Sequence, residues 1–418
     1  MPITYIDGTP VDDPLVSGTE GDDYITPLAG SDYVLARGGN DTVYGADGDD
    51  RIYGGDGTDL LHGDNGNDQL YVDQDVNYGF QWAYGEAGND ALFFQSGTRG
   101  LASGGDGTDT FFGDYRSYGA TIQFSLYSDG TGALWENPDV MPGARVMLEG
   151  IEKLFLQLGD YDDIVQGGNN GDIIDLGGGA NDARGGNGND WFIITPTAAN
   201  IIGAGAGHDT LSVYTSRTGL NADYRFTVSG TNATDSYGST YSGFDMFSFT
   251  GNAGNEFFRA GASNDNLAGM AGRDTLQGQD GSDFLSGGAD RDTLNGGRGE
   301  DRLTGGTGAD LLTGGLGADL FLFYETDAAD RIRDFEDGID RVQVLATALT
   351  GAPAAGTVPL VSLDRCVGFD GQFIQRYDAT LDRTTLQWDA NGRAAGGVVT
   401  LAVLDGAHAS LAGSIDLI

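Results

Sequence analysis

Residues 54–62 read GGDGTDLLH, and residues 305–313 read GGTGADLLT. Both fit one nine-residue pattern, G-G-x-G-x-D-x-U-x, in which U is a large apolar residue. The same frame fits the chain in three uninterrupted runs, of six, four and eight copies, over residues 18–71, 158–193 and 251–322. A flexible Gly-Asp linker would show no such phase and would not place an apolar residue two positions after each Asp. The repeat is therefore the unit from which the fold is built.

Each repeat predicts a tight turn followed by a short strand. Glycine at positions one, two and four permits positive φ angles and close approach of backbones. Because the chain reverses after each turn, successive repeats alternate between two sides of a flattened coil, and turns 18 residues apart stack, as with Asp274 and Asp292. The eighth-position residues, such as Leu276 and Leu285, point into the space between two sheets. The sequence predicts an all-β parallel β-roll.

This nonapeptide resembles the haemolysin-type repeat of the RTX (repeats-in-toxin) family, secreted calcium-binding β-rolls of Gram-negative bacteria. The resemblance implies bound Ca²⁺ as cofactor. Calcium takes six to eight oxygen ligands, more than one turn supplies, so two stacked turns must share each ion through carbonyls and the sixth-position carboxylates. This stacking predicts roughly a dozen ions. The candidate metal ligands are Asp41, Asp50, Asp59, Asp68, Asp163, Asp172, Asp190, Asp265, Asp274, Asp283, Asp292, Asp301, Asp310 and Asp319.

Isolated copies of the pattern carry Asp90, Asp109 and Asp209. The copy with Asp90 has no neighbour in phase with it. We therefore expect Asp90 to matter less for calcium than Asp292, which lies in the middle of the longest run.

The charge of the chain supports calcium as a structural partner. The 418 residues include 63 acidic and 21 basic side chains, for a net charge of −42. Rows of carboxylates at sheet spacing repel one another, so metal binding and folding are expected to be one event. Nucleic acid and anionic membrane surfaces are excluded as partners, because Lys153 is the sole lysine and no basic face is available.

The resemblance extends beyond the repeats. Residues 330–342, DRIRDFEDGIDRV, are similar to the segment that follows the roll in serralysin-type proteases, and residues 385–406 are similar to the strand-rich cap of that domain. The end, Ser414 to Ile418, resembles an uncleaved type I secretion signal. The N-terminus has no cleavable secretory signal, and no apolar run approaches the roughly 20 residues that span a bilayer. These features predict export by type I secretion machinery to the outside or surface of a Gram-negative cell, without membrane insertion.

The repeat blocks and the segments between them predict seven parts. They are a lead-in (1–17), repeat block 1 (18–112), a β insert (113–157), repeat block 2 (158–212), a second β insert (213–250), repeat block 3 (251–322), and a serralysin-like C-terminal cap with the secretion signal (323–418).

No enzyme motif is present. His62, His208 and His408 are too far apart for H-E-x-x-H, and there is no G-x-S-x-G. Tyr78-Gly79-Phe80 lacks the Asp and His of an alginate epimerase motif. His62 and His208 occupy variable repeat positions, so solvent-facing side chains are expected. The turn at residues 389–392 lacks the distal Glu of an EF-hand.

Two functions fit this sequence best, and an enzyme without a recognised motif is a third alternative. The favoured one is a non-enzymatic extracellular scaffold or surface-layer component that binds itself. The alternative is a calcium-dependent carbohydrate-binding protein or adhesin whose polysaccharide site lies on the inserts; the other reading of the inserts is wider, irregular coils of the same solenoid. Aromatic residues concentrate there: Tyr115, Tyr118, Phe124, Tyr127, Trp135, Tyr214, Tyr224, Phe226, Tyr237 and Tyr241.

Overall fold

The structure, a computed structural model, describes residues 3–73, 79–136, 146–218, 222–324, 327–345, 360–362, 372–378, 380–389, 398–406, 408, 411 and 414–417. Within them every regular element is a β-strand except one 3₁₀ turn, η1 (Thr215–Thr218). The chain divides into two compact units, one of residues 1–211 and 237–244, the other of residues 212–236 and 245–418. No described segment is a helix of the length and apolarity needed to cross a bilayer.

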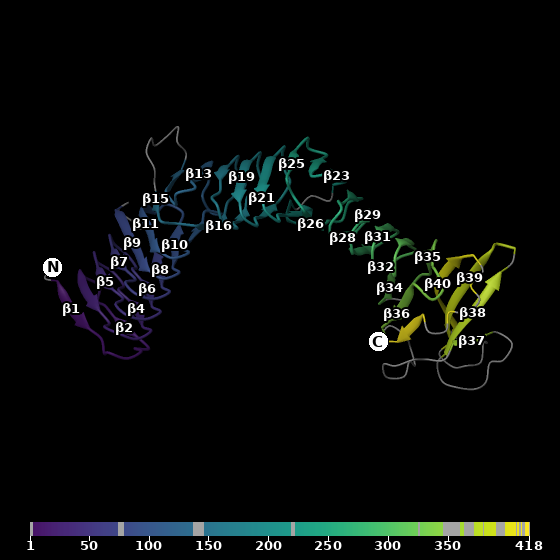
Figure 1. Cartoon of the computed structure of the whole chain (residues 1–418), viewed down its shortest axis with the longest axis horizontal. Helices are drawn as coiled ribbons and strands as arrows, with labels where there is room; N and C mark the ends of the chain where they lie inside the picture. The colour runs from purple at the N-terminus through teal and green to yellow at the C-terminus, as the bar shows by residue number, and fades with distance from the viewer. Residues whose placement is uncertain are drawn as a thin grey trace. The chain divides into compact units, whose positions relative to one another are not determined.

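The first unit is a parallel β-solenoid with two sheets (Figure 1). Its first sheet contains β1 (Thr4–Asp7), β3 (Asp23–Thr26), β5 (Thr42–Tyr44), β7 (Leu60–His62), β9 (Phe80–Ala87), β11 (Arg99–Asp106), β13 (Ile122–Leu126), β14 (Gly132–Glu136), β15 (Val146–Glu149), β17 (Ile164–Gln166), β19 (Asp182–Asn187), β21 (Ile201–Ala206) and β25 (Thr240–Ser242). Its second sheet contains β2 (Val16–Ser17), β4 (Tyr33–Leu35), β6 (Arg51–Tyr53), β8 (Gln69–Val72), β10 (Ala91–Gln95), β12 (Thr110–Asp114), β16 (Lys153–Gln157), β18 (Ile173–Asp175) and β20 (Trp191–Ile194). β22 (Thr210–Tyr214) crosses the boundary between the units.

The second unit has the same two-sheet architecture. One sheet contains β23 (Arg225–Ser229), β24 (Asn232–Asp235), β27 (Phe257–Arg259), β29 (Thr275–Asp280), β31 (Thr293–Arg298), β33 (Leu311–Leu316), β35 (Asp330–Ile332), β37 (Leu360–Ser362), β38 (Gln372–Asp378), β39 (Arg383–Asp389) and β40 (Val398–Asp405). The other contains β26 (Met246–Thr250), β28 (Asn266–Ala271), β30 (Phe284–Ala289), β32 (Arg302–Thr307), β34 (Leu320–Phe323), β36 (Arg341–Val344) and β41 (Ile415–Leu417).

Register follows the predicted spacing. Leu276 of β29 pairs with Leu294 of β31, and Leu285 of β30 pairs with Leu303 of β32, each 18 residues on and parallel. All four leucines are fully buried, because successive side chains of a strand point to opposite faces and the eighth position faces inward. The predictions of an all-β parallel β-roll and of an internal leucine ladder are confirmed.

Glycine allows the backbones of stacked turns to approach closely. Gly297 and Gly299, at positions two and four of one repeat, have φ of 121° and 132°. A Cβ on Gly299 would collide with the carbonyl oxygen of Gly281 in the stacked turn. Side chains at these positions would push the turns apart and break the ladder of strands.

Both inserts add antiparallel strands to the first sheet. In the first unit, β15 pairs parallel with β11 and antiparallel with β14. β14 in turn pairs antiparallel with β13, and β13 pairs parallel with β17. In the second unit, β23 pairs antiparallel with β24 and parallel with β27. These segments are therefore widened coils of the solenoid.

Half of the predicted aromatic residues of the inserts are internal. Tyr115, Phe124, Tyr224, Phe226 and Tyr241 are all at most 4% exposed. The expectation that these aromatic side chains form a ligand surface is wrong for those five, because the wider coils need large side chains to fill them. Only Tyr127 and Tyr237 of the predicted set are exposed among the described residues.

The described residues after block 3 form strands β35 to β41. β39 and β40 pair antiparallel, and β40 pairs parallel with β35, so residues 398–405 extend the sheet of the roll. Arg331 donates two hydrogen bonds to the carboxylate of Asp405 across this pairing, at 2.7 and 3.0 Å for the closest contacts of its two nitrogens. Residues 390–392 of the predicted turn, Tyr78 and Ile418 lie outside the described residues.

Candidate metal centres

The sixth-position aspartates form a ladder of side-chain to backbone hydrogen bonds. The N–H of Asp274 donates to Oδ1 of Asp292, and the N–H of Asp292 donates to Oδ1 of Asp310, both at 2.8 Å. The aspartate of each turn thus anchors the turn stacked beneath it. Because successive repeats alternate sides, two such ladders run along the solenoid.

All the predicted ligands take part in this arrangement. Each accepts a backbone N–H at 2.7–3.0 Å, and in all but one case the donor lies 18 residues earlier. None is more than 3% exposed: Asp41, Asp50, Asp59, Asp68, Asp163, Asp172, Asp190, Asp265, Asp274, Asp283, Asp292, Asp301, Asp310 and Asp319.

The second carboxylate oxygen is the group that points to a cation. At most of these positions Oδ2 is buried and accepts no hydrogen bond from the described residues. The positions are Asp41, Asp50, Asp68, Asp163, Asp190, Asp274, Asp283, Asp292, Asp301, Asp310 and Asp319. A buried, unsatisfied carboxylate oxygen is costly unless a proton or a metal ion satisfies it.

Backbone carbonyls lie beside these oxygens. A Cβ built on Gly45 would lie 2.5 Å from Oδ2 of Asp50 and 2.6 Å from the carbonyl oxygen of Gly63. A Cβ on Gly278 would likewise collide with Oδ2 of Asp283 and lie 2.7 Å from the carbonyl oxygen of Gly296. First-position glycine therefore leaves room where a carboxylate of one turn and a carbonyl of the turn stacked on it converge. Two hard oxygen donors from two turns fit a shared calcium ion.

Burial dominates the electrostatics of the ladders. It raises the pKa of Asp68 and of Asp292 to about 8, and that of Asp283 to about 7, against the lowering effect of the backbone N–H that each accepts. Neighbouring ladder carboxylates raise these pKa values further. The carboxylates therefore resist ionisation unless a cation compensates their charge.

No three acidic, histidine or cysteine side chains converge on one point within the described residues. A cation in these turns would thus be held by backbone carbonyl oxygens together with the carboxylate of one or two aspartates. This is the ligand composition that the repeat predicts, and it favours calcium over transition metals, which need nitrogen or sulfur ligands.

Amides replace carboxylates at some turns of one ladder. Asn181 accepts the N–H of Asp163 at 2.8 Å, as an aspartate would, but its Nδ2 donates to the carbonyl oxygen of Gly178 at 3.0 Å. Gln81 accepts the N–H of Asp59 at 2.6 Å and donates to the carbonyl oxygen of Gly57. At these turns the side-chain amide donates to a backbone carbonyl, and the side chain adds no charge.

The copies of the pattern that are isolated in the sequence, such as those with Asp90 and Asp109, stack on other turns in the structure. Asp90 accepts the N–H of Asp68 at 2.8 Å and donates its own N–H to Asp109 at 2.7 Å, so the ladder runs through the phase shift. The prediction that Asp90 lacks a stacked neighbour is wrong, because Asp68 and Asp90 are joined by the same ladder bond although 22 residues, not 18, separate them.

Several residues of the hydrogen-bond ladders do not fit the nine-residue pattern. Glu152 accepts the N–H of Asp109 at 2.9 Å where the first insert returns to the roll. Asp330 and Asp340 accept the N–H groups of Asp310 and Asp319, at 2.9 and 3.0 Å, and extend both ladders past block 3. Their separations of 43, 20 and 21 residues hide them from a search at fixed period; the sheet pairing identifies them.

The histidines lie apart from the ladders. His208 is exposed, as expected. His62 lies on the outer face, but its side chain is only 16% exposed, because it stacks between the rings of Tyr44 and Tyr84 and contacts Glu86 at 2.7 Å. His408 contacts Asp337 at 2.8 Å in the cap.

One family model agrees with this geometry. The family model of the RTX calcium-binding nonapeptide repeat (4 copies) matches residues 15–43, 35–70, 250–285 and 286–321. Among solved structures, the chain is similar to the AlgE6R2 subunit of the Azotobacter vinelandii mannuronan C5-epimerase, with 27% identity over 38% of this chain and 90% of that chain and a TM-score of 0.22. No curated protein matches the chain. Residues 15–70 and 250–321 thus match the RTX calcium-binding nonapeptide repeat.

Proposed function

We propose that the protein is a secreted, non-enzymatic β-roll that folds on calcium outside the cell and acts as an extracellular scaffold or surface-layer component. The buried Oδ2 atoms that accept no hydrogen bond from the described residues carry this proposal, since they repeat along both ladders. Calcium is scarce inside cells and abundant outside, so a fold that needs it forms after export. Roughly a dozen ions would offset more than half of the net charge of −42.

Circular dichroism of the full chain tests the calcium step. In chelator the spectrum should be that of an expanded chain, and calcium should produce β signal with a steep, cooperative midpoint. Magnesium should substitute poorly, because it requires small octahedral sites and retains its waters. Equal β content with and without calcium would contradict the proposal.

Export is tested separately. Removing about the last 60 residues, which include the cap strands β39 to β41, should leave the protein in the cytosol of a cell with a type I secretion system. Release of the truncated chain into the medium would argue for another route. Self-assembly of the calcium-bound protein, followed by light scattering, tests the scaffold role.

A further inference from the structure

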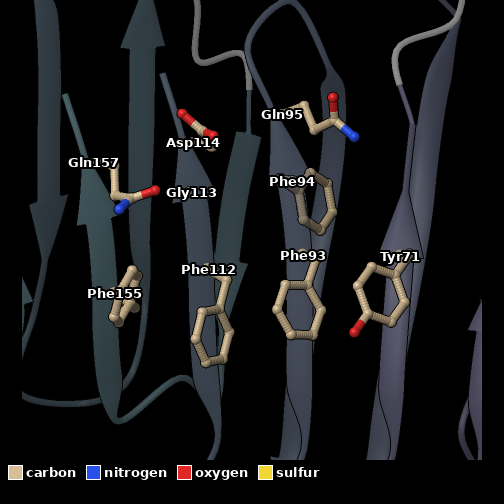
Figure 2. A pocket seen from close by; sticks show the side chains of 9 residues that line it. All are labelled: Tyr71, Phe93, Phe94, Gln95, Phe112, Gly113, Asp114, Phe155 and Gln157. Carbon is tan, nitrogen blue, oxygen red and sulfur yellow. The ribbon is translucent and has the colours of Figure 1, made fainter. Parts of the chain in front are cut away.

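A row of aromatic rings crosses the outer face of the second sheet in the first unit (Figure 2). The rings belong to Tyr53, Tyr71, Phe93, Phe112 and Phe155, from β6, β8, β10, β12 and β16. Consecutive centroids are 4.2, 4.2, 4.4 and 5.3 Å apart, with interplanar angles of 5° to 29°. Such distances between nearly parallel rings require offset stacking. Each ring therefore overlaps its neighbour only in part, and part of its face remains accessible.

A polar row runs parallel to the aromatic row. Gln95, Asp114 and Gln157 each follow a ring of the row by two residues, so they project from the same face, and they are in register across β10, β12 and β16. Gln95 donates to the carboxylate of Asp73 at 2.8 Å, which extends the polar row by one strand. Figure 2 shows the amide and carboxylate side chains above the rings, on the same side of the strands. Between the two rows lies a groove of about 440 Å³.

The β-roll itself does not require these aromatic rings. The corresponding outward positions of block 3 hold Ser286 and Thr304, in β30 and β32, and the parallel register is maintained there. A partly exposed row of aromatic side chains beside hydrogen-bonding groups is typical of an interaction surface.

Charge restricts what can occupy the groove. None of the residues lining it is a lysine or arginine. Arg116, two residues after Asp114, donates hydrogen bonds of 3.0 and 2.7 Å to the Asp114 carboxylate. Lys153 lies on the other side of the aromatic row. With a net charge of −42, the protein repels anionic polymers. The occupant that fits is uncharged, with an apolar face and many hydroxyl groups.

We propose that the groove between the aromatic row and the polar row binds a neutral polysaccharide chain. The C–H faces of the sugar rings pack on Phe93, Phe112 and Phe155, while sugar hydroxyls exchange hydrogen bonds with Gln95, Asp114 and Gln157. This assignment rests on the proposed extracellular function, and it places the carbohydrate site on the repeats of block 1 and the edges of the first insert. The internal aromatic residues of the insert take no part in it.

Isothermal titration calorimetry of the full calcium-bound chain tests this site. The probes are soluble oligosaccharides of neutral β-linked glucan, neutral α-linked glucan, neutral mannan and polygalacturonate. We expect binding of at least one neutral series and no binding of the uronate. The double variant Gln95→Ala/Gln157→Ala should bind about tenfold more weakly, the effect of losing two hydrogen bonds. Phe112→Ala should weaken binding by a similar factor.

Tyr24→Ala is the matched control, since Tyr24 belongs to an aromatic row on the first sheet of the same unit, 5.7 Å from Tyr44. Its affinity should equal that of the parent protein. The proposal is overturned if the folded protein binds no neutral glycan, if it binds the uronate more tightly, or if the double variant binds normally. It is also overturned if light scattering reveals a dimer that the double variant dissociates, because a second copy would then occupy the groove. Circular dichroism of the same samples reports calcium-dependent folding, so failure of the groove and failure of the proposed calcium function are distinguished.

Discussion

The backbone N–H of Asp292 donates to Oδ1 of Asp310 at 2.8 Å, while Oδ2 of Asp310 is buried and accepts no hydrogen bond from the described residues. One oxygen of the carboxylate therefore holds the stacked turn, and the other remains for a cation. The two roles reside in different atoms of one side chain. They can be separated by substitution.

Asp310→Asn should remove the cation ligand but keep the ladder bond, since Asn181 makes the same bond in another turn. Asp310→Ala removes both. Each variant should need more calcium to fold, and the alanine variant should lose about 1 kcal/mol more in calcium-saturated stability because of the lost hydrogen bond. Calcium titration followed by circular dichroism, with urea unfolding at saturation, measures the two effects. Asp280→Asn is the control, because Asp280 is an exposed acidic residue of the same block; an equal calcium shift in this control would attribute the effect to net charge alone.

The reverse substitution should create a site. Asn181→Asp places a carboxylate between Asp163 and Asn200 and removes the amide that donates to Gly178. Equilibrium dialysis should then detect about one more bound calcium, and thermal stability should depend more steeply on calcium concentration. An unchanged stoichiometry would mean that the amide turns already bind an ion through their carbonyls.

Stability without calcium should fall as pH rises. Burial raises the pKa of Asp68 and Asp292 from about 3.8 to about 8 in the folded protein, so the folded state retains protons that the unfolded chain releases. The resulting stabilisation is complete below about pH 4, decreases progressively as pH rises, and is lost above about pH 8. In chelator, β signal at pH 5 should exceed that at pH 8, and calcium should restore it at pH 8. Greater stability of the calcium-free protein at pH 8 would contradict this account.

The sequence predicted the regular parts of this molecule and missed those in which spacing varies. Leu276 and Leu294 were predicted to stack because their phase is uninterrupted, and the strand register confirms it. Asp90 and Glu152 were misjudged or missed because 22 and 43 residues, not 18, separate them from their ladder partners, although each occupies a regular step of the ladder. Stacking constrains the positions of strands in space, and it leaves the loop lengths between them free. The aromatic row on the outer face was not predicted, because ninth-position side chains vary between blocks. The row can be recognised only when strands from several coils are placed side by side.

First-position glycine provides the sharpest test of the two-turn site. Gly45 has no positive φ, so alanine there brings no backbone strain, yet its Cβ would lie 2.5 Å from Oδ2 of Asp50 and 2.6 Å from the carbonyl oxygen of Gly63. Gly45→Ala should therefore displace a carboxylate and a carbonyl together and raise the calcium midpoint of folding. Gly119→Ala is the matched control, because Gly119 is exposed and the nearest atom to its added Cβ, Oη of Tyr161, is 3.8 Å away. Stopped-flow or equilibrium calcium titrations of both variants decide the point. Equal midpoints would show that Gly45 is needed only for close packing of the turns and that the oxygens beside it do not share an ion.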